Sequence, residues 1–491
     1  MEPTPPRVDR RTLLRAGAGA LALPLVGGAA TTATATEQAG YEPLGSLELD
    51  EAYEAVVNED GTVAYVAVGT GFVSVDISDP ADPTVVGDAA SLSTPDGESL
   101  QQVWDVKYEN ERVLVAAAAN GRGPAGIFVF DVSDPANPEQ VGDWFETGHG
   151  NHNSHLVDGV AYLTGGYTLD MIDVSSDQFE RVGQWEPGDW KDEYDSVPYM
   201  ILHDLYVQDG TAYCAYWDGG TFIVDVSDPT SPEFVGHKSD MTPAELGDEP
   251  QSQYLEPTGN DHYVTVNEDA TLMAEGGESW DTSPNDDHGG PSGIELFDIS
   301  DPTKPQELAT IEAPHSGDNR YNGGTWTTAH NCELSNDKLY TSWYSGGVTV
   351  HDVSDPANPE SLSWWADADK YAFWTAQSVP GNEFFVASSC LEGSATTAGL
   401  LTFPDEPGQM ASDPEDVWWG EKPKQTTTTT EQQTTAAPTT TTTTTTEQGE
   451  TESTATTEES EISNGTPGFG VLAALGGLGL GVARFLRGRD E

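Results

Sequence analysis

The stretch that decides the fold is Phe222-Ile-Val-Asp-Val-Ser-Asp-Pro229. It is an apolar β-run that ends in Ser-Asp-Pro, where Asp can cap a turn and Pro, which has no backbone N–H, stops the ladder of a sheet. A degenerate copy is Met171-Ile-Asp-Val-Ser-Ser176, and the other clear copies are Phe72-Val-Ser-Val-Asp-Ile-Ser-Asp-Pro80, Ile127-Phe-Val-Phe-Asp-Val-Ser-Asp-Pro135, Ile294-Glu-Leu-Phe-Asp-Ile-Ser-Asp-Pro302 and Val348-Thr-Val-His-Asp-Val-Ser-Asp-Pro356. The chain therefore repeats one strand-and-turn unit.

Each copy lies inside a longer unit. Upstream, two β-runs are joined by a tight polar turn, which is a hairpin signal; these turns are Glu59-Asp60-Gly61, Asp158-Gly159, Asp209-Gly210 and Asn336-Asp337. Downstream, a further β-run ends in Val-Gly at Val86, Val141, Val182 and Val235. One unit is therefore four antiparallel strands, A to D, in about 45–55 residues, which is the period of a β-propeller blade.

The two ends of the repeated region complete each other. A seventh unit at 376–403 has strands B and C but no strand D, whereas Glu42-Pro-Leu-Gly-Ser-Leu-Glu-Leu49 has the D pattern with no strand before it. Joining the two closes a ring and removes its open edges. A stacked solenoid is the alternative, but its terminal repeats would need polar caps. The sequence predicts an all-β, seven-bladed β-propeller of four-stranded antiparallel blades over residues 41–404, with the last blade closed by the N-terminal strand.

The repeat resembles that of the LVIVD-repeat family of surface β-propellers. The resemblance is carried by the apolar strand and Asp of Phe222-Ile-Val-Asp-Val-Ser-Asp-Pro229 and its copies, and it covers roughly residues 41–404. It implies a propeller displayed at the cell surface. It implies no particular ligand, because propellers serve as binders, enzymes and scaffolds.

The charge balance points to a salt-adapted protein. Asp and Glu total 83 against 19 Lys and Arg, a formal net charge of −64. Multimolar salt screens such repulsion and favours a surface of hydrated carboxylates, so we expect a halophilic, haloarchaeal type of protein. Nucleic acid is excluded as a partner, because the only basic clusters lie at the termini. Three Cys, namely Cys214, Cys332 and Cys390, argue against a disulfide framework, and no pair has zinc-knuckle spacing.

Residues 1–35 have the features of a twin-arginine export signal. Asp9-Arg10-Arg11-Thr12-Leu13-Leu14-Arg15 is followed by an apolar, Ala- and Gly-rich run and by the small-residue site Ala33-Thr34-Ala35. No Cys follows the apolar run, so a lipoprotein cleavage box is absent. We therefore expect an exported protein whose attachment comes from its other end.

Residues 405–466 are predicted to be a disordered, acidic, Thr-rich stalk. Between 421 and 461 nearly every residue is Thr, Glu, Gln or Ser, and such a segment cannot bury enough apolar area to offset its ordering entropy. The composition is typical of O-glycosylated stalks, and Asn464-Gly465-Thr466 adds an N-glycosylation sequon at Asn464. A glycoprotein is the expectation.

Residues 467–491 form an apolar membrane or sorting segment with a basic tail. The apolar stretch opens with Pro467-Gly468-Phe469 and is closed by Arg484, Arg487 and Arg489, and its length is near the lower limit for a membrane span. This end resembles the PGF-CTERM sorting signal of archaeal surface proteins, which implies removal by an archaeosortase and replacement by a lipid. In either case the membrane holds the protein by its C-terminal anchor, on the extracellular face.

Propeller topology separates the loops into two sets. The A–B and C–D turns lie on one face and are short, whereas the B–C and D–A connections lie on the other and vary in length. We place an insertion at 268–291 between strands B and C of blade 5 and long D–A segments before blades 4 and 6, with the aromatic residues Trp185, Trp190, Tyr194, Tyr199, Tyr321 and Trp326. Variable loops on a rigid scaffold usually carry function, although salt-tolerant decoration is the alternative.

A histidine register lies at the start of the innermost strands, on that variable face. Ten residues before Tyr162, Tyr213 and Tyr340, the aromatics that open strand B, lie His152, His203 and His330. A count of ten back from Leu114 gives Trp104, and the same count from Phe384 gives Trp374. The corresponding residue of blade 5 is Gln253. Three converging imidazoles with an open position could hold Zn, Cu or Fe. The alternative is that they fill the channel wall, since blade 6 is two blades beyond blade 4.

Two functions follow from these features. The first is a non-catalytic module that binds an envelope protein, glycan or peptide through the face bearing Trp104, Gln253, Trp326 and Trp374. The second is a metal binder or metal-dependent enzyme that uses His152, His203 and His330. Calcium is less favoured, because the acidic loop Asn285-Asp286-Asp287 lacks EF-hand spacing. Hydrolase and nucleotide-binding motifs are missing from the sequence.

Overall fold

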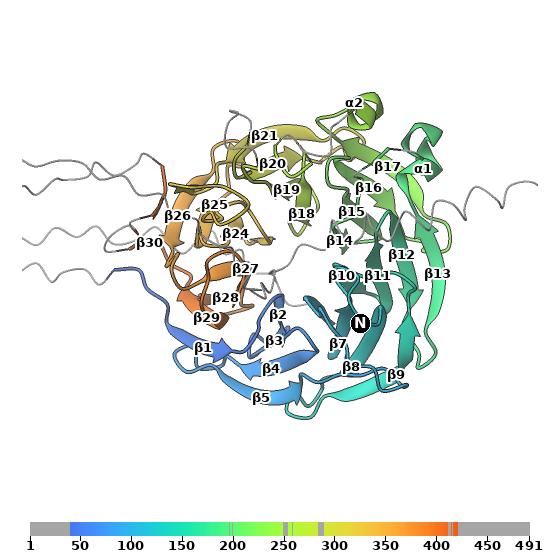
Figure 1. Cartoon of the computed structure of the whole chain (residues 1–491), viewed down its shortest axis with the longest axis horizontal. Coiled ribbons are helices and arrows are strands. Elements are labelled where there is room, and N and C mark those ends of the chain that lie inside the picture. Colours follow the sequence, from blue (N-terminus) through green and yellow to red (C-terminus); the bar gives the residue numbers. More distant parts are fainter. Residues whose placement is uncertain are drawn as a thin grey trace, which may run out of the picture. The chain divides into compact units, whose positions relative to one another are not determined.

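The computed structural model describes residues 40–195, 197–198, 200–248, 254–257, 259–282, 289–410, 414 and 416–420. They form seven blades, each built on four antiparallel strands, arranged around a common axis with almost no helix (Figure 1). The predicted all-β, seven-bladed propeller is confirmed. The predicted export signal, Asn464, Gln253 and the C-terminal apolar segment lie outside the described residues.

In blades 1 to 6 the chain runs from the innermost strand to the outermost. Blade 1 contains β2 (Ala55–Val57), β3 (Val63–Ala67), β4 (Phe72–Asp76) and β5 (Thr84–Ala89), and blade 2 contains β6 (Asp105–Glu109), β7 (Arg112–Ala117), β8 (Gly126–Asp131) and β9 (Glu139–Glu146). Blade 3 contains β10 (Ser154–Val157), β11 (Val160–Gly165), β12 (Thr168–Asp173) and β13 (Glu180–Trp185), and blade 4 contains β14 (Asp204–Gln208), β15 (Thr211–Ala215), β16 (Thr221–Asp225) and β17 (Glu233–Lys238).

Blade 5 contains β18 (Asp261–Val266), β19 (Leu272–Gly277), β20 (Ile294–Asp298) and β21 (Gln306–Ile311), and blade 6 contains β23 (Cys332–Ser335), β24 (Lys338–Ser342), β25 (Val348–Asp352) and β26 (Glu360–Trp365). Blade 7 contains β27 (Ala372–Ser378), β28 (Phe384–Cys390) and β29 (Ala398–Pro404), and its outer strand is β1 (Gly45–Leu49). The short helical segments are α1 (Pro187–Trp190), a 3-10 turn (Asp192–Tyr194) and α2 (Pro243–Asp248).

The ring is closed by pairing the N-terminal strand with the last blade. β1 runs antiparallel to β29, with Gly45 opposite Thr402 and Leu49 opposite Ala398. Figure 1 shows β1, in blue, beside the orange β29. Because a closed ring has no free sheet edge at its seam, this pairing removes the site at which a propeller would open or aggregate. The predicted closure is confirmed.

The Ser-Asp-Pro turns between the third and fourth strands are held by two successive side-chain caps. Asp225 accepts hydrogen bonds from the backbone N–H and the hydroxyl of Ser227, at 2.9 and 2.7 Å. Asp228 then accepts one from the N–H of Thr230 at 3.0 Å. The bonds from Ser227 stabilise the ionised form and lower the pKa of Asp225. The repeated Asp residues therefore fix the turn by local Asx geometry.

The repeated Val-Gly pair of the outer strand has a packing role between blades. A Cβ added to Gly236 would lie 1.9 Å from the carbonyl oxygen of Pro302, in the turn of the next blade. Gly45, Gly87 and Gly183 lie in the same way against Pro80, Pro135 and Pro229. Only glycine allows this approach, so the Val-Gly pair and the Ser-Asp-Pro turn are two halves of one contact.

Blade 5 differs from the sequence prediction. The insertion was placed at 268–291, but residues 272–277 form the second strand, β19, and the connection to β20 spans 278–293. The reason is that Tyr263, which lies on the innermost strand β18, resembles the aromatic that opens strand B in other blades. Leu272-Met273-Ala274, the true start of that strand, has no aromatic residue.

The described chain continues beyond the predicted domain end at 404. β30 (Gly408–Gln409) runs parallel to β26, and β31 (Val417–Trp418) pairs with β22 (His315–Ser316). Val417 is fully buried and the indole of Trp419 packs on Trp343. Short strand pairings and apolar side chains thus fasten 408–410 and 416–420 beside blade 6. No helix among the described residues is long and apolar enough to cross a membrane.

Candidate functional site

A closed ring of seven aromatic side chains, one from each blade, lies where the innermost strands begin. Adjacent ring centroids are 4.1–5.8 Å apart all the way round. The members, in blade order, are Tyr53, Trp104, His152, His203, His262, His330 and Trp374. The blades therefore bring four imidazoles into one continuous row, flanked by two indoles and a phenol.

Five of the ring members were expected from the sequence register. His152 and His203 are neighbours with centroids 4.2 Å apart, whereas His330 is separated from His203 by His262, which lies 4.2 Å from His203 and 4.6 Å from His330. The position that the register gave to Gln253 is held by His262. The register therefore predicted five of the seven ring members and missed Tyr53 and His262.

The missed member has a physical explanation in its hairpin. Blades 1 and 5 share an Asn-Glu-Asp-x-Thr turn, in which Asn58 and Asn267 each accept hydrogen bonds from two later backbone N–H groups. This turn is two residues longer than the Asp-Gly turns of blades 3 and 4, so a count of ten residues misses the ring. A count of twelve from the matching Tyr65 and Ala274 reaches Tyr53 and His262.

The predicted tryptophans belong to this ring or pack beside it, but they are buried. Trp104, Trp326 and Trp374 belong to one cluster with Trp280, and they are 9, 7 and 7% exposed. Trp326 reaches the ring through Tyr344, whose centroid is 5.4 Å from that indole and 4.8 Å from the His330 imidazole. These side chains therefore close the channel mouth from above and do not present a flat aromatic platform.

A polar layer lies next to the aromatic ring, made largely of the residue that follows each ring member. Lys107 forms ion pairs with Asp105 and, at 3.4 Å, with Glu54. Glu54 also accepts hydrogen bonds from the Asn331 amide and the Thr375 hydroxyl. Burial raises the pKa of Glu54 to about 7, against the opposing charge of Lys107. Burial alone would lower the pKa of Lys107, but the adjacent carboxylates raise it above its usual value.

Beyond the polar layer the channel widens into a cavity of about 190 Å³, which has room for several water molecules. All seven blades line it, through residues that include Val56, Lys107, His155, Leu205, Tyr263, Glu333 and Ala376. The channel therefore has an aromatic end, a charged middle and a wider end that is lined by both polar and apolar side chains.

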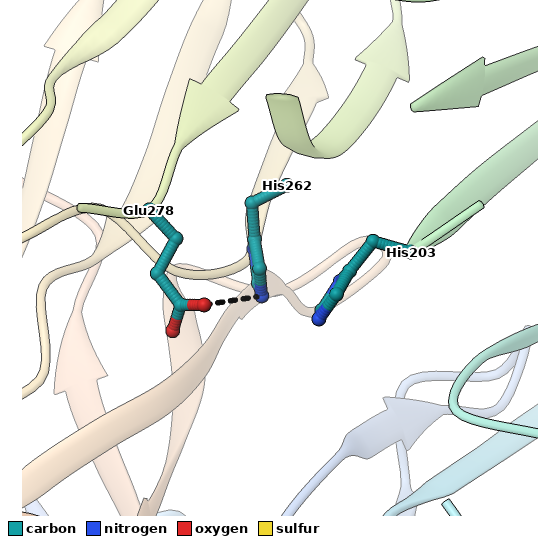
Figure 2. Close-up of side chains that lie close together, drawn as sticks. All are labelled: His203, His262 and Glu278. Carbon is teal, nitrogen blue, oxygen red and sulfur yellow. Dashed lines mark ion pairs between the residues drawn. The ribbon is translucent and has the colours of Figure 1, made fainter. Parts of the chain in front are cut away.

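One group of side chains at the aromatic end has the composition of a metal site. Figure 2 shows His203, His262 and Glu278 converging, with ligand atoms that lie within 4.8 Å of one another. His262 Nε2 is 3.6 Å from Glu278 Oε2, and Tyr344 donates a hydrogen bond of 2.5 Å to the other carboxylate oxygen. Glu278 directly follows β19, so a strand end and two inner strands position the group.

Burial controls the protonation of this group. It lowers the pKa of His203 and of His262 well below the usual value, so both imidazoles are neutral at neutral pH. It raises the pKa of Glu278 to about 8, and the hydrogen bond from Tyr344 opposes that rise. Two neutral imidazoles and a carboxyl group are a ligand set for a first-row transition metal. The acidic loop Asn285-Asp286-Asp287 lies outside the described residues.

These features define the class of the protein: a seven-bladed β-propeller whose channel mouth is closed by aromatic and imidazole rings. The LVIVD repeat matches residues 59–90 and 203–239, which lie in blades 1 and 4. The chain thus contains LVIVD repeats within a propeller. No curated protein matches the chain.

Solved structures with similar folds are β-propellers. The β-propeller domain of Cps50 (Swd1) from Myceliophteria thermophila is 8% identical over 74% of this chain and 99% of its own, with a TM-score of 0.51. U3-55K (11% identity, 74% and 98% coverage, TM-score 0.48) and the WD40 repeats of RRP9 (11% identity, 75% and 99% coverage, TM-score 0.49) also match. At such low identity the first similarity establishes the fold alone.

Proposed function

We propose that the chain is an exported, membrane-tethered β-propeller that acts as a binding module on the outer face of the cell membrane. Export is supported by the twin-arginine pattern of residues 1–35, and tethering by the Thr-rich segment and the apolar tail that begins at Pro467. The acidic composition suits a surface in contact with concentrated salt.

The observation that carries the binding role is the difference between the two faces of the ring. One face has short turns of nearly constant geometry, fixed by the Asp caps described above. The other has connections of unequal length, among them residues 186–203, 239–260, 278–293 and 312–331. Two of these loops meet at a bridge between Asp281 and Arg320. Variable loops held by a rigid ring are the usual place of recognition.

The expected ligand is an envelope protein that meets this variable face, and a glycan or peptide is the alternative. Leu391, which directly follows β28, is 44% exposed next to the aromatic cluster containing Cys390. An exposed Leu beside a large, mostly buried aromatic cluster is a suitable anchor for a partner.

Cross-linking on intact cells tests this function. Cells that produce the full chain are treated with a cross-linker that does not cross the membrane. We expect a cross-linked partner with the wild type, which Leu391→Asn weakens. Val85→Asn is the matched control, because Val85 is 43% exposed but lies on the outer strand β5. Equal cross-linking of both variants, or no labelling of intact cells, would contradict the proposal.

A further inference from the structure

The two outer imidazoles of the row have defined tautomers. His330 Nδ1 lies 2.8 Å from the carbonyl oxygen of Trp374, and His152 Nδ1 lies 3.2 Å from the side-chain oxygen of Asn120. Because these oxygens can only accept, Nδ1 carries the proton in both rings and Nε2 holds the lone pair. Metal-binding histidines are commonly fixed in this way by a carbonyl or an amide oxygen.

The two inner imidazoles have unsatisfied nitrogens. Nδ1 of His203 and Nδ1 of His262 are buried and have no hydrogen-bond partner among the described residues. A buried polar atom without a partner carries a free-energy cost of about 1–3 kcal/mol. Two such atoms on adjacent rings need a partner that the described residues do not supply, which water or a bound ion can provide.

Glu278 adds a buried carboxyl group that has no cation beside it among the described residues. Its side chain belongs to a residue that is 3% exposed, and its contacts are the hydroxyl of Tyr344 and the neutral ring of His262. Within the described part of the chain, no Lys or Arg forms an ion pair with it. Burial without a counter-charge disfavours the ionised form of this carboxyl group, and a bound cation would favour that form.

We propose that His203, His262 and Glu278 bind one divalent first-row transition metal ion at the channel mouth. His152 and His330 flank these two imidazoles in the ring. The three ligand atoms lie within 4.8 Å of one another, while ligands around a tetrahedral ion at about 2.1 Å lie about 3.4 Å apart. Small side-chain rotations bring them into contact with the ion. Imidazole nitrogens select Zn, Cu or Fe over Ca or Mg.

The surroundings leave one side of this ion accessible. His152 and His203 are half-buried, whereas His262 and His330 are each 2% exposed. A small ligand such as water would therefore reach the ion from blades 3 and 4, while Tyr344 holds the Glu278 carboxylate from the other side. Two imidazoles, a carboxylate and an open position are the donor set of metal sites that bind exogenous ligands.

Metal titration of the full chain, solubilised in its native salt and stripped with a chelator, tests the site. We expect one tightly bound Zn²⁺ per chain and at least tenfold weaker binding in His262→Gln and Glu278→Gln. His203→Gln provides a third variant at a half-buried position that is less demanding for folding. His315→Gln is the control, since it removes an exposed imidazole from β22 and should leave binding unchanged.

Cu²⁺ provides a readout that surface carboxylates cannot imitate. Its electron paramagnetic resonance spectrum should show hyperfine structure from two nitrogens in the wild type and from fewer nitrogens in His262→Gln. Binding without nitrogen ligation, or equal binding by the wild type and by variants that melt normally, would overturn the site. The cross-linking experiment does not depend on metal, so failure of one proposal does not imply failure of the other.

Discussion

At the scale of single residues, the repeat carries two kinds of information. Asp225 and Asp228 act locally, because their carboxylates cap the turn in which they lie. Gly236 acts between blades, because its missing side chain lets the carbonyl of Pro302 approach. The residues that recur most regularly in the sequence therefore determine turn geometry and blade packing, while the channel residues vary from blade to blade.

The glycine contact predicts a specific loss of stability. Gly236→Ala would place a methyl group 1.9 Å from the carbonyl oxygen of Pro302, so the neighbouring blade must move. We expect the free energy of unfolding to fall by about 1–3 kcal/mol, as for other overpacked sites. Gly247→Ala is the control, since a Cβ there meets nothing within 4 Å. Thermal unfolding at constant salt compares the two variants. Equal melting temperatures for Gly236→Ala and Gly247→Ala would contradict the steric argument.

The channel carboxyl Glu333 predicts a dependence of stability on pH. Burial raises its pKa to about 7, which outweighs the opposing hydrogen bonds from Ser378 and Gln377, and Glu268 raises it further. A group whose pKa is higher in the folded state than in the unfolded state stabilises the fold below the unfolded value. That contribution is lost as the pH rises from about 4.5 to about 7.

Glu333→Gln isolates this effect, because an amide oxygen can still accept the bond from Ser378. We expect the variant to melt several degrees above the wild type at pH 8 and close to it at pH 4.5, measured by circular dichroism at fixed salt. If the difference in melting temperature between the variant and the wild type is the same at both pH values, the carboxyl group does not titrate as argued.

The sequence could predict the channel ring only where hairpins have equal length. His152, His203 and His330 follow from one count because their A–B turns match, while His262 follows an Asn-Glu-Asp-x-Thr turn that shifts the count by two. Glu278 could not be found in this way. It lies in a connection between the second and third strands that is much longer than in the other blades, so only its position in space relates it to His262.

At the scale of elements, β1 has a role that its own contacts do not suggest. It is short and only Leu47 and Leu49 pack against a core cluster, but it pairs with β29 along its whole length. Gly45 also approaches the carbonyl of Pro80 in blade 1, so the closing strand repeats the contact made between other blades. The half-blades at the two ends of the repeat made this closure predictable.

Deleting residues 41–50 should therefore destabilise the whole ring. The deletion exposes β29 along its length and removes Tyr41, whose hydroxyl donates to the Pro404 carbonyl at 2.8 Å. We expect the melting temperature to fall by well over five degrees. Removing ten residues from the Thr-rich segment, 426–435, is the matched control and should have no effect. A melting temperature within a degree or two of the wild type would show that pairing of β1 with β29 does not determine the stability of the ring.

At the scale of the whole molecule, two of the scarce lysines lie in the interior. Lys107 contacts Asp105 and Glu54 inside the channel, and Lys238 is 9% exposed among several carboxylates between blades 4 and 5. With a net charge of −64, the exterior is left to carboxylates and their counterions. This charge distribution agrees with the proposal of a propeller exposed to concentrated salt.

The anchor is the last feature that the sequence predicts, and two of its properties point to one event. The segment from 421 to 461 is too polar to fold, and the apolar tail is barely long enough to span a bilayer while opening with Pro467-Gly468-Phe469. A permanent span has no need of so specific an opening. We therefore expect cleavage near this tripeptide and attachment of a lipid, so that a tag placed after Glu491 is lost while the propeller stays in the membrane fraction. Mass spectrometry of the mature protein measures the outcome. An intact peptide that runs from Leu472 to Arg484 in the main species would instead establish an uncleaved transmembrane anchor.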